Sequence, residues 1–576
     1  MFALFAAVSW QRWIEPYVDS GRELMVPWRL AHGERLYGEL QFNHGPLGPW
    51  LAAIADHFAG ASLPARTALA ALVALLHLAA LARLARRWLS PWRAALATSV
   101  AVVTAMFLRP GGWLFPFSLD VAVAIAALTW GLVFAAREPS TAWDAAAGAC
   151  VLAALLSRLE LGLAGAAVFA FAARARPRRL VPLAVAPLAG AAAGYGLLSL
   201  GIPRDTLVRD GWLALLAPPP AFANVYRAYA GLDRPGLRGA ELLLAAFVLL
   251  LLACLIVAAS VAAARLAASG RTGAGFAVVG AAVAALLAAA ALAARPPAGL
   301  ADSLALLPPL VRVVPLAVAA AALGRLVPAL RGLPARGVLA AVPDAAVWLG
   351  AVFAARVLLA AGYVGPYDAF FLPLPLVLAQ AGLFGLADRF TRSLGAALPR
   401  LVGAALVVFA GFRGLALVDF YRGIPWGRVE TPAGALYLPG PVAETTASAL
   451  TALSRLPARE TLSGFPEAGF FGYVLGRRSP FPVEQFFPGH LDDAGEARIV
   501  ARLRERPPDA LVFANVLAVG EGAPAFGRDY LGRLDAAARE RYRTVAVFGP
   551  GASPGARIGD PQFFVEVAVP RTEAGP

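Results

Sequence analysis

The sequence predicts an α-helical protein that crosses a membrane about thirteen times and ends in a soluble α/β domain. Of its 576 residues, 59% are hydrophobic and only 15% are charged, against roughly 25% charged residues in an average soluble domain. Apolar runs near the ~20 residues that a helix needs to cross a bilayer recur along most of the chain. Beyond Arg428 these runs give way to mixed segments. No stretch alternates as the strands of a membrane barrel do.

Thirteen apolar runs are the predicted transmembrane helices, and together they form a membrane domain over residues 1–427. They lie at 1–13, 66–88, 91–108, 118–137, 142–157, 159–173, 180–200, 240–264, 273–294, 309–327, 338–361, 368–387 and 401–420. The first run is short for a span, so we expect it either to tilt against its neighbours or to continue upstream. It lacks the basic segment and the cleavage site of a signal peptide.

Arginine determines the predicted orientation, because the sequence has no lysine and all 50 basic residues are arginine. With thirteen spans, five groups of arginines fall on one side of the membrane, and the positive-inside rule makes that side the cytoplasm. The groups are Arg83, Arg86, Arg87 and Arg93; Arg174, Arg176, Arg178 and Arg179; Arg265 and Arg271; Arg325, Arg331 and Arg336; and Arg389, Arg392 and Arg400. The first loop (14–65), the 201–239 loop and the C-terminal domain (428–576) are then expected outside the cytoplasm, in the periplasm or at the cell exterior.

The net charge of +14 comes from the membrane domain, since residues 428–576 hold 17 acidic residues and 16 arginines. Arginines that face anionic lipid on the cytoplasmic side explain the excess, so no nucleic-acid partner is implied. Cys150 and Cys254 lie inside apolar runs, and we interpret them as small core residues rather than as a disulfide or a metal site. The lysine-free, alanine-rich composition is typical of GC-rich bacterial genomes and indicates a bacterial inner (plasma) membrane.

The C-terminal domain is predicted to alternate strands with amphipathic helices, as small α/β layer domains do. The strands are expected near 434–438, 510–514, 544–548 and 562–569, and the helices near 442–455, 493–506 and 528–541. This segment has no Gly-rich phosphate loop, no Cys/His zinc spacing and no Gly-x-Ser-x-Gly elbow. We therefore expect it to shape access to a site rather than to react.

The first loop places a carboxylate just after the first span, and a segment rich in Trp, Pro, His and Gly follows. Its motifs are Asp19-Ser20-Gly21-Arg22-Glu23, Leu30-Ala31-His32-Gly33-Glu34-Arg35-Leu36-Tyr37 and Asn43-His44-Gly45-Pro46-Leu47. They resemble the first periplasmic loop of the bacterial GT-C glycosyltransferases, which include the protein O-mannosyltransferases and the lipid A aminoarabinose transferases. In those families an acidic motif precedes a helix, a G-x-x-x-Y segment and a turn that contains proline. The layout of spans with an outward C-terminal domain extends the resemblance to the whole chain.

The resemblance implies an inverting hexosyl or pentosyl transferase that moves a sugar from a polyprenyl-phosphate donor to a lipid, glycan or protein acceptor at the periplasmic face. The family motif is commonly Asp-Glu or Asp-Asp, whereas Ser20 follows Asp19 here. We therefore expect no cofactor, with a divalent cation as the alternative. A lipid-linked sugar transporter (flippase) and an inactive assembly protein of the same fold are the alternative functions. A transporter needs polar groups at mid-membrane, and the span interiors are almost free of charge.

Asp19 and Asp120 are the predicted catalytic residues. A carboxylate just outside the first span can take the proton of the acceptor as the sugar carbon is attacked. The alternative for Asp19 is that it caps a helix that begins at Gly21. Asp120 follows a Pro/Gly/aromatic break on the same outer side, a position similar to that of a second acidic residue in the resembled families. Its alternative is a solvated helix start that Ser118 caps.

Four further residues are predicted to bind substrate: His44, Glu160, Tyr363 and Tyr367. Glu160 lies in an outward turn with Arg158, and a structural ion pair between them is the alternative. His44 stands next to a Gly-Pro turn and suits a hydrogen bond to phosphate or to backbone. Together with His32 and His57 it fits no zinc spacing. The two tyrosines open the twelfth span and are expected to line the same cavity.

Arginines on the outer side are the candidates to hold the donor phosphate, because the guanidinium fork matches phosphate oxygens. Arg22 lies in the first loop, and Arg204, Arg209 and Arg227 lie in the 201–239 loop. For each of them, anchoring at the membrane interface is the alternative.

Overall fold

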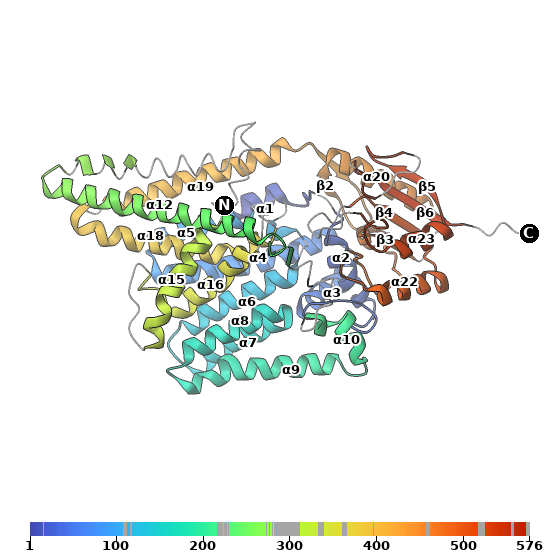
Figure 1. Ribbon diagram of the computed structural model, residues 1–576, viewed down its shortest axis with the longest axis horizontal. Helices are drawn as coiled ribbons and strands as arrows, with labels where there is room; N and C mark the ends of the chain where they lie inside the picture. The colour runs from blue at the N-terminus through green and yellow to red at the C-terminus, as the bar shows by residue number, and fades with distance from the viewer. Residues whose placement is uncertain are drawn as a thin grey trace, which may run out of the picture.

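The protein, described here by a computed structural model, has a helical part and a C-terminal part built around a β-sheet (Figure 1). The structure describes residues 1–576 except 15, 108–111, 116–117, 216–222, 224–226, 229, 272, 276, 279, 282–311, 332–338, 360–365, 395–396, 457–460, 517–524, 554–557, 561 and 572–576. The run predicted at 273–294 lies mostly outside the described residues. The other predicted runs each overlap a helix.

The helical part runs from α1 to α19, with short 3-10 and π-helical turns between some of its helices. The elements are α1 (Phe2–Ser9), α2 (Ser20–Ala31), α3 (Leu47–Ala59), α4 (Leu63–Trp88), α5 (Pro91–Ala101), η1 (Val102–Met106), η2 (Gly112–Leu114), α6 (Leu119–Ala135), α7 (Thr141–Ser157), α8 (Leu159–Ala173), η3 (Pro177–Arg179), η4 (Val181–Val185), α9 (Ala186–Leu198), α10 (Arg204–Asp210), η5 (Trp212–Leu215), α12 (Pro235–Ala268), α15 (Val313–Leu330), α16 (Asp344–Leu359), α17 (Pro366–Phe371), α18 (Pro373–Leu394) and α19 (Ala397–Gly423).

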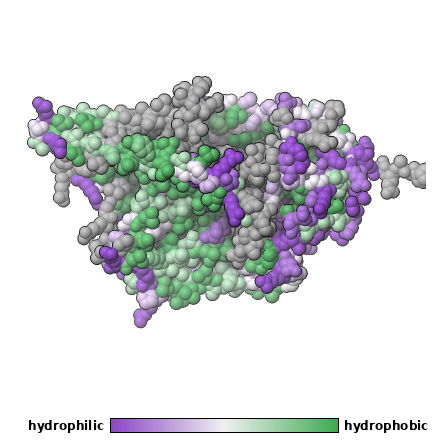
Figure 2. Space-filling model, in the orientation of Figure 1, coloured by the Kyte–Doolittle hydropathy of each residue, from purple (hydrophilic) through white to green (hydrophobic). Residues whose placement is uncertain are grey.

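Within the described part of the chain, four helical stretches are long and apolar enough to cross a membrane: Leu63–Trp88, Pro177–Leu198, Val313–Leu330 and Leu398–Gly423. The shorter apolar helices α6, α7 and α8 pack in the same group. Large apolar side chains cover the outside of the helical part, whereas hydrophilic residues cover the C-terminal part (Figure 2). An apolar surface of this extent fits a bilayer. The count of thirteen spans stays a prediction.

Small residues let neighbouring helices of the membrane part approach closely, as is common in lipid. A Cβ on Gly162 of α8 would lie 2.4 Å from the Cα of Leu155 in α7. A Cβ on Gly148 of α7 would lie 1.9 Å from the carbonyl oxygen of Pro182. The turn between α7 and α8 is therefore a tight one, and Arg158 is its single linking residue.

The C-terminal part contains a two-stranded and a four-stranded sheet with helices on both faces of the larger one. Its elements are β1 (Trp426–Val429), β2 (Leu436–Pro439), α20 (Gly440–Arg455), β3 (Leu462–Phe465), α21 (Gly469–Leu475), α22 (Asp493–Glu505), β4 (Ala510–Ala514), α23 (Gly532–Arg541), β5 (Tyr542–Phe548) and β6 (Val565–Pro570). The strand order of the larger sheet is β3-β4-β6-β5, with β3 parallel to β4 and the other pairs antiparallel. The predicted strands and helices correspond to β2, β4, β5, β6, α20, α22 and α23, whereas β1, β3 and α21 were not predicted.

The alternation of side chains along β4 explains how the helices cover this sheet, because successive residues point to opposite faces. Val512 belongs to the core that α20 and α21 cover. Leu511 and Phe513 belong to the core that α22 and α23 cover. Strand β4 is thus buried on both faces, whereas the edge strand β5 is partly exposed.

The first loop docks onto the C-terminal part, and α2 and α3 lie between the helical part and the sheet (Figure 1). The N–H of Trp13 donates to the carbonyl of Tyr437 at 3.0 Å, and the N–H of Tyr437 donates to the carbonyl of Gln11 at 2.8 Å. In α2, Gly21 lies so close to α21 that a Cβ would be 3.0 Å from the nitrogen of Gly469. The two helices therefore meet backbone to backbone.

Candidate active site

Asp19 connects the first loop to the C-terminal part. It occupies the position before α2 with a φ of +59°, which is uncommon for a residue with a Cβ. Its N–H donates to Oε2 of Glu467 at 2.8 Å, and its Oδ1 accepts from Nε2 of Gln485 at 2.8 Å. Its side chain makes no capping hydrogen bond to α2, which begins at Ser20. The capping alternative for Asp19 is therefore wrong.

Arg22 lies between the two carboxylates of this helix end. Its Nη1 donates to Oε1 of Gln485 at 2.6 Å, and its Nη2 donates to Oε1 of Glu23 at 3.1 Å. The same Nη2 is 3.6 Å from Oδ1 of Asp19. Because one Gln485 amide bonds both Asp19 and Arg22, the C-terminal part fixes the relative positions of their side chains.

Glu23 is buried, with 7% of its surface exposed. Burial raises the pKa of the Glu23 carboxyl to about 7; the Arg22 guanidinium opposes this increase, and the charges of Asp120 and Asp19 add to it. The carbonyl of Glu23 accepts a hydrogen bond from Nη2 of Arg66. Nη1 of the same Arg66 lies 3.7 Å from Oδ2 of the buried Asp56.

Asp120 lies in the first turn of α6, fully buried. Its Oδ1 accepts from the N–H of Val121 at 2.9 Å, and its Oδ2 lies 3.4 Å from Nε of Arg158. Ser118 makes no side-chain cap, so a solvated helix start capped by Ser118 is wrong. Gly48 of α3 packs directly on Asp120, since a Cβ there would be 2.8 Å from the Asp120 Cβ.

Arg158 joins Asp120 to two other predicted residues. Its Nε lies 3.5 Å from Oε1 of the exposed Glu160, and its Nη1 is hydrogen-bonded to Nδ1 of His44. Burial, with the Arg158 charge as a second cause, lowers the pKa of His44 well below its usual value. The ring is therefore neutral and accepts from Arg158. The carbonyl of His44 accepts from the hydroxyl of Tyr37 at 2.6 Å.

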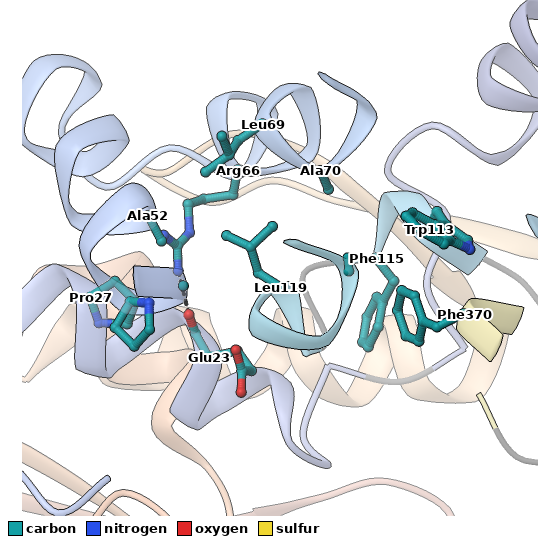
Figure 3. Close-up of a pocket in the computed structure, with 13 residues that line it drawn as sticks. Glu23, Pro27, Ala52, Arg66, Leu69, Ala70, Trp113, Phe115, Leu119 and Phe370 are labelled. Atoms are coloured by element: carbon teal, nitrogen blue, oxygen red, sulfur yellow. Dashed lines mark hydrogen bonds between the residues drawn. The ribbon is translucent and has the colours of Figure 1, made fainter. Parts of the chain in front are cut away.

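A cavity opens beside Glu23 and Arg66, and the remaining wall is apolar (Figure 3). Figure 3 shows the two charged residues on one side and the rings of Trp113, Phe115 and Phe370 on the other. The other residues that line it are Pro27, Gly48, Pro49, Ala52, Leu69, Ala70, Leu119 and Ala122. Helices α2, α3, α4 and α6 thus enclose a space in which one carboxylate and one guanidinium face hydrophobic side chains.

The 201–239 loop does not join this cluster. Arg204 is exposed at the start of α10, Arg227 is exposed, and Nε of Arg209 pairs with Oδ2 of Asp210 at 3.1 Å. Among the described residues, no hydrogen bond or ion pair joins these arginines to Asp19, Arg22 or Glu23. Of the two predicted tyrosines, Tyr363 lies outside the described residues. Tyr367 belongs to α17, and its side chain is not described.

Four residues of the cluster were not predicted: Glu23, Arg66, Glu467 and Gln485. The sequence could have indicated Glu23, because a residue four positions after Asp19 lies on the same face of a helix. Arg66 marks the start of the predicted span at 66–88, and its sequence context indicates no further role. Glu467 and Gln485 lie in the connections after β3 and before α22, where no pattern marks them.

No three His, Cys, Asp or Glu side chains come together in a way that could hold a metal ion within the part of the chain that the structure describes. Cys150 and Cys254 are free thiols.

The fold is similar to that of solved GT-C membrane glycosyltransferases. ArnT from Cupriavidus metallidurans bound to undecaprenyl phosphate, a lipid A aminoarabinose transferase, matches with a TM-score of 0.50 at 13% identity, over 100% of this chain and 97% of ArnT. Apo ArnT matches at 0.49 and 13%, over 98% and 96%. The Archaeoglobus fulgidus oligosaccharyltransferase in complex with Zn and sulfate matches at 0.49 and 15%, over 96% of this chain and 72% of the enzyme.

No protein-family model matches the sequence, and no curated protein matches it. At 13% identity, the likeness to ArnT shows the fold. The GT-C resemblance that the first loop predicts is thus confirmed at the level of the fold.

Proposed function

We propose that this protein is a glycosyltransferase that moves a sugar from a polyprenyl-phosphate carrier to an acceptor at the outer face of a bacterial inner membrane. The observation that carries the proposal is the charged cluster of Asp19, Arg22, Glu23 and Asp120, in which Glu23 and Asp120 are buried and Glu23 lines a largely apolar cavity. Preorganised charges in a site that excludes water are the main means by which enzymes stabilise a developing charge. The GT-C fold supports a lipid-linked donor, since ArnT was solved with undecaprenyl phosphate.

The proposed reaction is a single displacement. A hydroxyl oxygen of the acceptor bonds to the anomeric carbon of the sugar, and the bond from that carbon to the phosphate oxygen breaks. Polyprenyl phosphate departs with the electron pair, and the proton of the hydroxyl passes to a carboxylate of the site, for which the sequence indicates Asp19. Attack from the face opposite the leaving group inverts the anomeric centre. No cofactor takes part in this scheme.

The other predicted residues divide between donor and acceptor. Arg22 is the arginine that we propose to bind the donor phosphate, because it lies next to Glu23, which lines the cavity. The side-chain amide of Gln485, from the C-terminal part, orients it. Asp120 orients the acceptor, with His44 and Glu160 held near it through Arg158. We propose Arg204, Arg209 and Arg227 as interfacial residues farther from the reacting atoms.

The proposed topology has thirteen spans, with residues 1–427 in the membrane and residues 428–576 as a periplasmic α/β domain over the site. The hydrogen bonds from Asp19 to Glu467 and Gln485 support it, because they require the first loop and the C-terminal domain to lie on one side of the bilayer. An alkaline phosphatase fused after Pro576 is expected to be active, and a green fluorescent protein exported there by the Sec route is expected to stay dark. The reverse pattern contradicts the proposed topology.

A transfer assay tests the proposed activity. The purified protein in vesicles receives a panel of radiolabelled undecaprenyl-phosphate monosaccharides, with a lipid and protein extract of bacterial membranes as acceptor. We expect label from one donor to move into the acceptor fraction, and Asp19→Asn to slow the transfer while leaving yield and membrane insertion unchanged. Failure of the parent protein with every donor contradicts the proposal.

A further inference from the structure

The carboxylates of Asp19, just before α2, and Glu23, in its first turn, lie four residues apart and have different surroundings. We propose that Glu23, rather than Asp19, accepts the proton of the acceptor hydroxyl, and that Asp19 is a positioning residue. This inference rests on the proposed transferase function and specifies its catalytic base.

The two carboxylates differ in their access to the cavity. Glu23 lines the cavity, whereas Asp19 is not among the residues that enclose it. Within the described chain, Arg22 is the one group that hydrogen-bonds the Glu23 carboxylate, and it does so through Oε1. Oε2 is left for a substrate hydroxyl. A general base must lie within hydrogen-bond reach of the proton that it takes, and Glu23 meets this condition for any acceptor that enters the cavity.

The charges around Glu23 suit a base that works near neutral pH. Arg22 precedes it on α2 and Asp19 lies just before that helix, Asp120 adds its charge from α6, and Arg66 of α4 donates to its carbonyl. Burial is the largest cause of a pKa of about 7, a value at which a carboxyl group can both take up and release a proton near neutral pH. The carboxylate can therefore take a proton during the attack and release it to water afterwards.

Asp19 acts through other residues. Its carboxylate accepts from Gln485, and the same amide accepts from Arg22, which donates in turn to Glu23. Its N–H is bound to Glu467, so its uncommon backbone conformation is held from the C-terminal part. This chain of bonds fixes where the Arg22 guanidinium and the Glu23 carboxylate stand relative to the cavity.

Substitutions that preserve shape test the assignment. Glu23→Gln keeps an oxygen for Arg22 but removes the base, so kcat should fall by about 10²–10⁴-fold with the donor KM unchanged. The rise of kcat as the pH passes through about 7 should disappear. Glu23→Asp should recover part of the rate, because it restores a carboxylate. Asp19→Asn should lose less activity and keep the rise. Glu39→Gln, which removes an exposed carboxylate of the same loop, is the control.

A measurement without substrate makes the test independent of the assay. Infrared difference spectra of the protein in vesicles should show a carboxyl group that titrates near pH 7 in the parent, that titrates at a lower pH in Asp19→Asn because the Asp19 charge is gone, and that is missing from Glu23→Gln. The proposal is overturned if Glu23→Gln keeps the parental kcat, or if the pH-dependent rise is lost in Asp19→Asn and kept in Glu23→Gln. A parent protein that transfers from no donor overturns the proposed function instead, and the base role falls with it.

Discussion

Two segments predicted to lie outside the membrane, the first loop and the 201–239 loop, carry the arginines predicted to meet a phosphate, yet within the described residues only Arg22 of the first loop joins the charged cluster beside the cavity. In the first, Arg22 bonds Gln485 from the far end of the chain and the buried Glu23. In the second, Arg209 pairs with Asp210, its neighbour in sequence. The difference shows that the surrounding framework, rather than the charge, makes an arginine part of a site.

The hydrophobic core around the first loop is larger than the one around the 201–239 loop. The first loop shares a hydrophobic core with the C-terminal part, to which α2 contributes Leu24, Met25 and Trp28. Helix α10 of the 201–239 loop contributes Leu207 to a small cluster with Val26 and neighbouring aromatic residues. A larger core holds side chains in defined positions more strongly, because each rotamer is locked by more contacts. Substitutions in the two loops should therefore differ in effect.

The largest contrast is expected between Arg22 and Arg209. Arg22→Gln should lower sugar transfer by about 10²–10³-fold, the usual effect of removing one preorganised donor to a developing negative charge. Arg209→Gln should leave the rate near that of the parent, because its one partner among the described residues is the neighbouring Asp210. Transfer assays of the two variants at equal protein levels measure the contrast. Equal losses would mean that the 201–239 loop also reaches the donor.

The second contrast concerns stability against pH. The pKa of Glu23 is raised from 4.5 to about 7 by folding, so the unfolded chain gives up this proton first, and stability falls as the pH rises between these values. At 1.36 kcal/mol per unit, the fall attributable to Glu23 is about 3 kcal/mol. Glu23→Gln should flatten the unfolding free energy over this range. Unfolding of both proteins in one detergent measures it, with Glu39→Gln correcting for the loss of one charge. A slope identical to the parent's contradicts the prediction.

The third contrast tests the docking of the first loop by adding a methyl group. In Gly469→Ala the new Cβ would lie 3.2 Å from the carbonyl carbon of Gly21, and neither backbone can move aside easily. The cost should be about 1–3 kcal/mol, with some loss of transfer, because α21 would draw away from α2. Gly236→Ala, in the first turn of α12 and within the 201–239 segment, places a Cβ in open space and is the matched control. Melting temperatures of the two variants decide the point, and equal values would show that the close approach is unimportant.

The smallest effect is expected from metal removal. The Asp19 carboxylate is engaged by Gln485 and Arg22, and the next residue is Ser20 rather than a second acid. Transfer should therefore persist in EDTA. Complete loss, restored by added magnesium or manganese, would show that other acidic or histidine side chains complete a cation site.

Elements that a local sequence pattern marks could be predicted, whereas elements without such a pattern could not. Membrane helices such as α4, α6 and α19 were predicted because an uninterrupted apolar run is itself the signal. Strand β4 (Ala510–Ala514) was found for the same reason. Strand β3, with the sequence Leu-Ser-Gly-Phe, is four residues long and contains a serine and a glycine, so neither length nor alternation marked it. Helix α21 has two glycines in seven residues and was missed because helix propensity disfavours glycine.

The candidate site divides in the same way. Asp19 and Asp120 were predicted on one outer side from the order of spans, and both belong to the charged cluster. Helical periodicity could also have predicted Glu23, four residues after Asp19. Gln485 could not be predicted, because its contact with Asp19 depends on the docking of two distant segments, and composition carries no trace of such a contact. The donor-binding role of the arginines of the 201–239 loop stays a prediction, since charge and side of the membrane are its only support.

The bond between Asp19 and Gln485 also has a consequence for biosynthesis. The two residues are 466 positions apart, and at ribosomal rates of 5–20 residues per second roughly 25–90 s separate their synthesis. During that interval the nascent chain has inserted its first helices with α2 lacking the amide that orients Arg22. On the proposed function, the newborn protein therefore cannot consume donor lipid until its last segment has emerged and folded. A chain that is truncated before Gln485 should therefore lack transferase activity.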